Sequence, residues 1–216
     1  AKYLNSPETP LFHKGDNLYN LATARQAAHE GAPLIAVEGY VDVIAMVTAG
    51  FPATVAPLGT ALTEEQLGLL WKMADEPILC FDGDSAGIKA AYRAMDLALP
   101  LLKPGHSLKF ALLPEGQDPD DLLKAQGPEA VKAVIEAAEP LSDVIWRRAL
   151  TENDRATPER KAQFERDLRG LLNQIGDETV RKHYMADLTS RFDQLFQRNR
   201  GAGNFRPRSP NFTQKP

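Results

Sequence analysis

Cysteine and long apolar segments are the features that this sequence lacks most clearly. Its 216 residues include one cysteine, Cys80, and no apolar run approaches the ~20 residues of a membrane-spanning helix. A single cysteine excludes a disulfide framework and a cysteine-rich zinc site, so we expect no zinc and a reducing, cytoplasmic location. The first residues also lack the basic and apolar segments of a signal peptide, and we expect no membrane contact.

Excess positive charge is also missing. The net charge is −4, which argues against a protein that coats nucleic acid non-specifically. Contact with DNA or RNA would therefore need a local basic patch or bridging metal ions.

The first two thirds of the chain alternate short apolar segments with helical patterns. Continuous apolar strands between helices of this length predict an α/β fold with a parallel sheet covered on both faces. Thr63 is expected to cap its helix, with Gln66 completing a capping box. The expected strands are 34–37, 53–56, 77–81 and 108–113, and the expected helices are 21–29, 40–49, 63–74 and 85–102.

The last third of the chain shows only helical patterns up to Phe196. The expected helices are 128–138, 141–150, 158–174 and 177–196, so we predict an all-helical subdomain after the sheet. The stretch 197–216 has five basic residues, no acidic residue, and several Gly and Pro residues. Such a composition cannot bury a core, and we expect a disordered basic tail.

Acidic residues follow three of the predicted strands. Glu38 follows the first strand, Asp82 and Asp84 follow the third, and Asp118 and Asp120 lie shortly after the fourth. The carboxyl ends of parallel strands meet at one edge of a sheet, so these side chains should share one rim. Clustered carboxylates repel one another unless divalent cations neutralise them, and hard oxygen ligands favour Mg²⁺ or Mn²⁺.

Each acidic motif also has a purely structural interpretation. Asp82-Gly83-Asp84 could be a simple turn, Glu38 a solvated strand end, and Asp118 a helix N-cap. Only their joint placement favours a metal site. Ser85 and Gly87 open a helix that could receive a phosphate, and Gly59 and Thr60 could belong to the same nucleotide loop, but an ordinary cap and loop fit the spacing as well.

The motifs together are similar to a known family. Segments 37–42, 58–60, 81–87 and 116–120 resemble the metal-binding domain shared by topoisomerases and primases, and segment 2–15 resembles the bacterial replicative DNA primases. The resemblance implies a Toprim-like domain over 34–127. It would be preceded by the end of a polymerase subdomain (1–33) and followed by the helical subdomain (128–197) and the tail (198–216).

The resemblance also implies an activity: a DNA-directed RNA polymerase that makes short RNA primers on single-stranded DNA from nucleoside triphosphates. Glu38 would serve as general base or metal ligand, Asp82 and Asp84 would hold the catalytic magnesium, and Asp118 and Asp120 would recruit a second ion. The residues expected to contact template and nascent RNA are Lys2, Asn5 and Lys14.

Some parts of such a primase are expected outside this chain. With one cysteine the zinc module would be missing, and the helicase-binding domain would lie beyond the tail. We therefore expect a monomeric piece of a larger primase that binds divalent metal but initiates primers poorly by itself.

Two other functions stay open on the sequence alone. One is a metal-dependent nuclease or topoisomerase-like strand breaker that uses the same rim, although none of the five tyrosines stands in a context typical of a nucleophile. The other is a non-catalytic acidic α/β module that binds protein partners.

Overall fold

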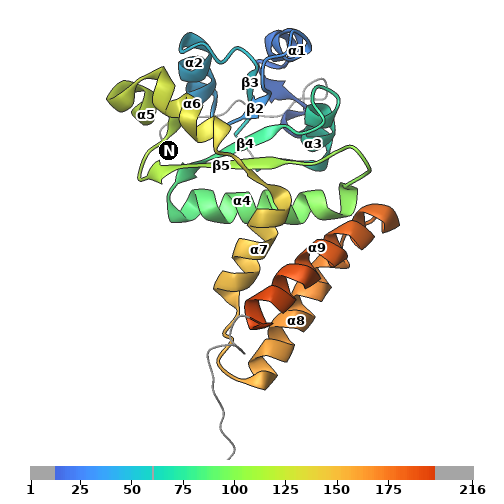
Figure 1. Cartoon of the computed structure of the whole chain (residues 1–216). Helices are drawn as coiled ribbons and strands as arrows, with labels where there is room; N and C mark the ends of the chain where they lie inside the picture. The colour runs from blue at the N-terminus through green and yellow to red at the C-terminus, as the bar shows by residue number, and fades with distance from the viewer. Residues whose placement is uncertain (1–12, 60, 198–216) are drawn as a thin grey trace, which may run out of the picture.

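The protein is built on a mixed sheet with helices on both faces, followed by three further helices (Figure 1). The computed structural model describes residues 13–59 and 61–197. The strand order is β1-β3-β2-β4-β5-β6. The strands are β1 (Leu18–Tyr19), β2 (Ile35–Ala36), β3 (Thr54–Pro57), β4 (Ile78–Gly83), β5 (Lys109–Glu115) and β6 (Glu139–Pro140).

The four central strands are parallel, as the sequence predicts, and both edges are antiparallel. β1 pairs with β3 and β6 pairs with β5 in the antiparallel sense. The expectation that no strand follows residue 128 is therefore wrong at β6. Neither edge strand was predicted, because two residues carry no alternation of apolar and polar side chains.

Side chains of the central strands alternate between two cores. Leu34, Ala36, Val55, Leu79 and Phe110 pack on one face, and their strand neighbours pack on the other. The first core also receives α1 (Leu21–His29), α3 (Glu64–Trp71) and α4 (Ser85–Ala98). The second receives α2 (Tyr40–Thr48), α5 (Pro119–Gln126) and α6 (Pro128–Glu136). Helix α6 thus shares a core with the sheet, although the sequence placed it in the helical subdomain.

The predicted capping box at the start of α3 is confirmed. The Gln66 backbone N–H donates to Thr63 Oγ1 at 3.1 Å, and the Thr63 N–H donates to Gln66 Oε1 at 3.1 Å. The buried Gln66 amide also donates to the carbonyls of Lys14 (3.0 Å) and Asn17 (2.8 Å). This cap therefore holds the 3₁₀ turn η1 (Lys14–Asp16) against the start of α3.

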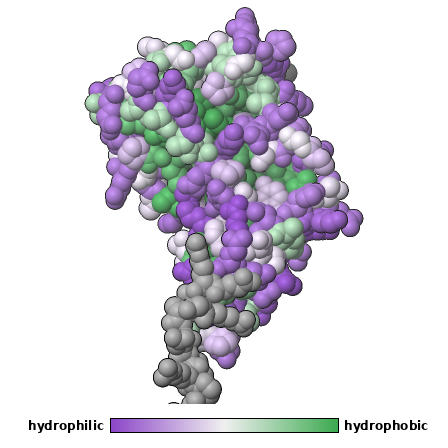
Figure 2. All heavy atoms as spheres, in the orientation of Figure 1, coloured by the Kyte–Doolittle hydropathy of each residue, from purple (hydrophilic) through white to green (hydrophobic). Residues whose placement is uncertain are grey.

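Of the last three helices, α7 (Leu141–Glu152) packs against α4, and α8 (Pro158–Leu172) and α9 (Glu178–Gln197) pack against α7 and against each other. Phe164 of α8 lies at their centre, with ring centroids 5.8 Å from Trp146 and 5.3 Å from Phe192. Buried residues of α7, α8 and α9 belong to the same hydrophobic core as α4 and the sheet. In the space-filling view, hydrophilic side chains surround patches of hydrophobic surface on the sheet-bearing part (Figure 2).

The end of α4 differs from the sequence expectation, and the predicted tail cannot be compared with the structure. The helix expected to reach residue 102 ends at Ala98 and continues as the 3₁₀ turn η2 (Leu99–Leu101). The tail at 198–216 lies outside the described residues. Within the described part, no helix combines the length and the apolar character needed to span a bilayer.

Candidate metal centre

The acidic residues predicted from the sequence lie at the carboxyl ends of β2, β4 and β5. Glu38 follows β2, Asp82 is near the end of β4, and Asp118 follows β5. Two of these strand ends are joined directly, because the backbone N–H of Asp82 donates to Glu38 Oε1 at 3.3 Å. The structure therefore brings the acids of β2 and β4 together, as the parallel arrangement predicts.

Electrostatics extends the cluster to further carboxylates. Partial burial, reinforced by the charges of Glu38, Asp42, Asp118 and Asp84, raises the pKa of Asp82 to about 7. Each of these like charges favours the protonated form of Asp82, and a bound cation would reverse that effect. The cluster is thus poised to bind an added cation.

Asp42 belongs to the cluster, and the sequence analysis did not select it. Burial, then Asp118 and further acids, raise the pKa of Asp42 to about 6. Its Oδ2 accepts from the backbone N–H of Gly39 at 3.1 Å, which completes the N-terminal cap of α2. The position of Asp42 could have indicated this role. It is the third residue of α2, which starts shortly after β2 ends, and so it stays close to the rim.

Two of the other acids, Asp84 and Asp118, accept hydrogen bonds from backbone N–H groups at the N-termini of helices. Asp84 Oδ1 accepts from the N–H groups of Ala86 (2.8 Å) and Gly87 (2.7 Å), so it caps α4. Asp118 Oδ1 accepts from the Asp121 N–H at 2.7 Å, so it caps α5. The capping role considered for Asp118 is therefore real.

These caps set the geometry of the rim. Among residues 13–59 and 61–197, no three His, Cys, Asp or Glu side chains converge closely enough to form one metal shell. The oxygen donors have the right chemistry for a hard cation. Each of the two caps uses only Oδ1 of its aspartate, so Oδ2 of Asp84 and of Asp118 is not used in the cap.

The structure also shows three of the residues predicted for the nucleotide loop. The Gly87 N–H that could receive a phosphate donates to Asp84 instead. Gly59 has φ +78°, a left-handed conformation that favours glycine. Ser85 is the first residue of α4.

Glycines allow the backbone segments at the rim to approach one another. A Cβ on Gly83 would lie 1.9 Å from the Pro114 carbonyl oxygen, and one on Gly87 would lie 2.1 Å from that of Asp82. Only a residue without a Cβ allows β4 to come this close to the end of β5, and α4 to come this close to β4. The glycines therefore help to bring the acids together.

A cleft opens beside the acids. Its volume is about 500 Å³, and Glu38, Leu62, Phe81 and Arg93 are among the residues that line it. Cys80 also lines it, but burial and the charge of Asp82 raise the pKa of its thiol to about 12. The thiol therefore stays protonated at neutral pH and is a poor nucleophile.

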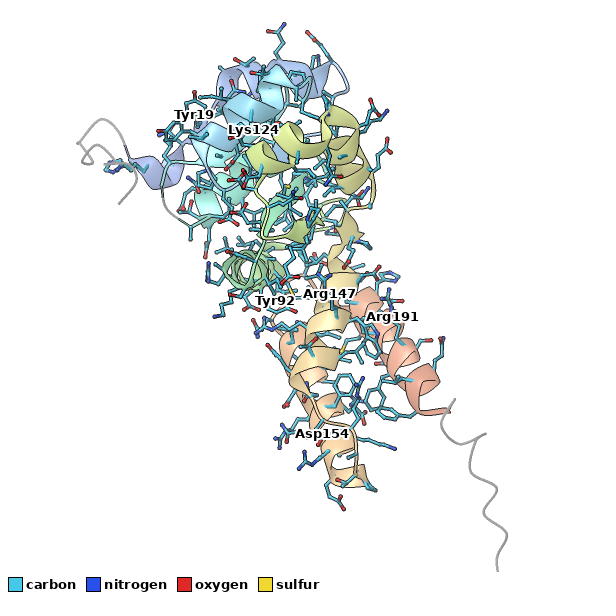
Figure 3. The ribbon with its side chains drawn as sticks, turned by 90° about the vertical axis from the view of Figure 1, so that its left-hand side faces the viewer. Tyr19, Tyr92, Lys124, Arg147, Asp154 and Arg191 are labelled. Carbon is cyan, nitrogen blue, oxygen red and sulfur yellow. The ribbon has the colours of Figure 1, made fainter. Side chains whose placement is uncertain are left out.

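Lys14 belongs to the 3₁₀ turn η1. Its turn η1 is fastened to the start of α3, which follows the carboxyl end of β3. Figure 3 shows Tyr19 and Lys124 on the same side of the molecule, toward the viewer. Lys124 forms an ion pair with Asp120, four residues earlier on α5. Lys2, Asn5 and Thr60 lie outside the described residues.

Three family models match the chain. Residues 32–112 match the Toprim domain, residues 1–25 match the N-terminal domain of the DNA primase catalytic core, and residues 142–196 match the DnaB-helicase binding domain of primase. The Toprim match runs from β2 into β5 and includes Glu38, Asp82 and Asp84, whereas Asp118 and Asp120 lie just beyond its end.

Relatives and solved structures agree with these matches. The chain is 44% identical over 181 residues to a DNA primase of Pseudomonas aeruginosa and 41% identical over 194 residues to that of Escherichia coli strain K12. It also resembles a structure of the DnaG catalytic core, with a TM-score of 0.82 and 40% identity over 89% of this chain and 62% of that one. A DnaG catalytic domain bound to ssDNA matches with a TM-score of 0.80 and 41% identity, over 88% of this chain and 61% of that one.

This chain belongs to the bacterial DNA primases. The alignment with the P. aeruginosa primase includes 83% of this chain but 27% of that protein, and the alignment with the E. coli primase includes 90% of this chain but 33% of that protein. The chain thus spans about a quarter to a third of such a primase. The Toprim-like α/β fold predicted from the sequence is confirmed.

One expectation about this primase chain has to be revised. The sequence analysis placed helicase binding in a domain outside the chain, yet the helicase-binding family model matches 142–196. That match coincides with α7, α8 and α9. The three helices have weak motifs of their own, which is why sequence reasoning did not connect them with a partner.

Proposed function

We propose that this chain supplies the metal-binding part of the catalytic core of a DNA primase. Such an enzyme polymerises nucleoside triphosphates into short RNA primers on a single-stranded DNA template. The observation that carries the proposal is the gathering of acids at the ends of β2, β4 and β5, where the Asp82 N–H donates to Glu38 Oε1 and burial, together with the neighbouring carboxylates, raises the pKa of Asp82 to about 7. The names of the relatives support primer synthesis over strand cleavage or a non-catalytic role.

The proposed cofactor is Mg²⁺ or Mn²⁺, because the donors are carboxylate oxygens. Glu38, Asp82 and Asp84 hold one ion, and Asp118 and Asp120 recruit a second. When bound, such ions stabilise negative charge on the attacking and leaving oxygens of a phosphoryl transfer. Glu38 is the general base: it accepts the proton of the attacking 3′-hydroxyl while the Asp82 N–H fixes its carboxylate.

The other residues are proposed to hold the strands and the triphosphate. Lys14, with Lys2 and Asn5, contacts phosphates of the template and the nascent RNA. Gly59, Thr60, Ser85 and Gly87 shape the nucleotide loop. A phosphate at the start of α4 would take the N–H groups that Asp84 now accepts from.

We also propose domain boundaries for the chain and a binding partner for its helical subdomain. The sheet and its helices form the Toprim-like unit between 1–33 and the helical subdomain, with 198–216 as a linker. A boundary near Leu141 would keep α6 with the sheet whose core it shares. Helices α7 to α9 are the proposed contact with the replicative helicase, and the chain acts as a monomer in the cytoplasm.

Calorimetry with Mn²⁺ tests the metal site without requiring activity. We expect the 216-residue chain to bind Mn²⁺, and Asp82→Asn to weaken binding at least tenfold because a central ligand loses its charge. Asp75→Asn is the matched control, since this exposed aspartate lies just before β4 begins, at the opposite edge of the sheet. Equal binding by the wild type and Asp82→Asn would refute the proposed metal site.

A further inference from the structure

Exposed apolar side chains border the acidic rim. In the described part of the chain, the exposed large hydrophobic residues are Tyr19 (36%), Tyr40 (39%), Val41 (37%), Ile44 (51%) and Ile88 (41%). Tyr40 and Val41 open α2, two and three residues after Glu38, and Ile88 stands in the first turn of α4, four residues after Asp84. Apolar groups gathered beside a charged site indicate a binding surface rather than scattered exposure.

Two of these residues form an aromatic pair. The ring centroids of Tyr19 and Tyr40 are 5.9 Å apart, with an interplanar angle of 56°. Tilted contacts of this kind stabilise both rings and limit their motion. Tyr19 comes from the edge strand β1 and Tyr40 from α2, so the pair is anchored by two separate elements.

The pair is close to the proposed metal ligands. Tyr40 is two residues from Glu38 and two residues from Asp42, which lie on either side of it at the start of α2. Helix α2 packs against α5, the helix that carries Asp120. Tyr40 therefore stands on a helix that contacts the acid-bearing helix directly, and Figure 3 shows Tyr19 and Lys124 in the same upper part of the molecule.

We propose that Tyr40, braced by Tyr19, is the stacking surface for the base of the nucleoside triphosphate whose phosphates the acidic cluster binds through a divalent metal. This inference rests on the proposed function and adds a positioning residue to it. The phosphates and the carboxylates are both negatively charged, so a metal ion must lie between them. The base is flat and uncharged, so an aromatic ring can bind it by stacking. Aromatic side chains stack on any base, so the platform would suit a polymerase that uses all four nucleotides.

A fluorescent nucleotide tests the platform directly. The probe is 2-aminopurine riboside triphosphate, whose fluorescence is quenched on stacking, titrated with the 216-residue chain and Mg²⁺. We expect quenching that EDTA abolishes. Tyr40→Leu should weaken binding about tenfold, the loss that removal of one stacking contact commonly causes. Tyr40→Phe should retain both binding and quenching, and Tyr19→Leu should fall between Tyr40→Leu and the wild type.

His106→Leu is the matched control. His106 stacks on Trp71 with centroids 5.6 Å apart, just before β5 begins and so at the opposite edge of the sheet. Removal of this ring should leave the titration unchanged. Circular dichroism of each variant checks folding, and the Tyr40→Phe and Tyr19→Leu results decide the matter should Tyr40→Leu fail to fold.

Several outcomes would overturn the platform. These are unchanged binding by Tyr40→Leu, equal losses in Tyr40→Leu and His106→Leu, or no quenching by a wild type that still binds Mn²⁺ through Asp82. In each of these cases the metal site stands and only the stacking role is lost. Nucleotide binding that survives Asp82→Asn and EDTA would instead contradict the proposed function itself.

Discussion

Asp82 is partly buried among other carboxylates, and this single residue ties the stability of the metal-free protein to pH. Its pKa is near 7 in the folded protein, against an ordinary value of 3.8. Between these values the folded state binds more protons than the unfolded state, so stability falls as pH rises from about 4 to 7 and is constant above that. Asp42, with a pKa of about 6, acts in the same direction.

Asp82→Asn should therefore stabilise the metal-free protein at high pH. We expect a gain on the order of 1 kcal/mol at pH 8 in EDTA, after discounting for the solvent that screens a partly exposed carboxyl. Thermal unfolding of both proteins from pH 4 to 8 measures it. The difference in Tm should grow from pH 4 to 7, and a difference that shrinks over this range would show that Asp82 has a stabilising partner.

Gly87 sets how closely α4 approaches β4. In Gly87→Ala the new Cβ would lie 2.1 Å from the Asp82 carbonyl oxygen, so the backbone must shift at the rim. We expect a loss of about 1–3 kcal/mol in the free energy of unfolding, together with weaker Mn²⁺ binding.

Gly68→Ala supplies the control for that substitution. Gly68 lies in α3, and a Cβ there would meet no atom within 4 Å. Alanine in this open helical position should raise stability by about 0.5–1 kcal/mol. Chemical denaturation of both variants measures the two effects, and equal changes would mean that the close approach at Gly87 relaxes without cost.

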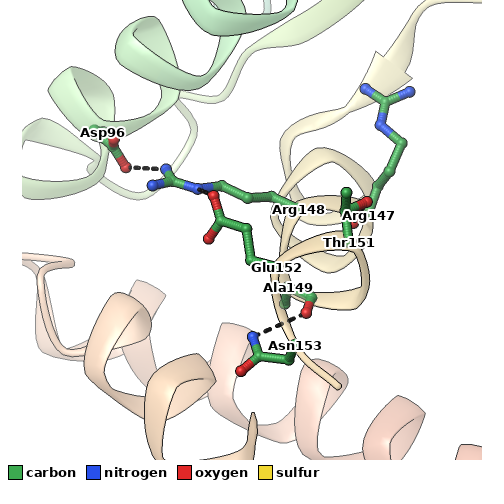
Figure 4. A network of polar contacts seen from close by, with 7 residues as sticks. All are labelled: Asp96, Arg147, Arg148, Ala149, Thr151, Glu152 and Asn153. Atoms are coloured by element: carbon green, nitrogen blue, oxygen red, sulfur yellow. Dashed lines mark hydrogen bonds and ion pairs between the residues drawn. The ribbon is translucent and has the colours of Figure 1, made fainter. Parts of the chain in front are cut away.

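At the scale of elements, α4 connects the acidic rim with the last three helices. Its first turn is capped by Asp84, and its other end contacts α7 (Figure 4). Arg148 of α7 donates to Asp96 of α4 at 2.7 Å and to Glu152 of its own helix at 2.9 Å. The Arg148 guanidinium also lies 5.2 Å from the centroid of the Tyr92 ring.

Arg148→Met should loosen this junction. It removes the ion pair with Asp96 and the contact with Tyr92, and we expect a loss of about 1–2 kcal/mol. Arg169→Met is the control, because its partner Glu165 lies on the same exposed helical face, where such pairs contribute about 0.3–0.5 kcal/mol. Urea denaturation compares the two, and a cost for Arg148→Met no larger than for the control would refute the junction.

Most of the secondary-structure elements could be predicted from the sequence, but the two edge strands could not. Apolar strands, helix caps and the strand-end acids have local patterns, so the parallel strands, the Thr63 cap and the shared rim were predicted. Strands β1 and β6 form only because longer strands offer free edges, which no local pattern reveals. Asp42 was not predicted as a member of the cluster, because its closeness to Asp118 depends on how α2 packs against α5, which no local pattern shows.

At the scale of the whole molecule, the sheet and the helical subdomain share one hydrophobic core. Leu79 and Phe110 of the sheet belong to the same core as Leu141 of α7 and Phe164 of α8. Proteins whose parts share a continuous core unfold cooperatively. We therefore expect one unfolding transition for the described part of the chain, although it matches separate family models.

The two tryptophans allow this expectation to be tested. Trp71 packs on the sheet side of the core, where its Nε1 donates to the Ser107 carbonyl at 2.8 Å, and Trp146 packs on Phe164 in the helices. Trp71→Phe and Trp146→Phe each leave one reporter. Phe164→Ala, placed in both backgrounds, should cost about 3–5 kcal/mol and lower both fluorescence midpoints together. A midpoint that falls for Trp146 alone would mean that the helices unfold separately from the metal-binding sheet, so that a partner bound to them could not stabilise the rim through the shared core.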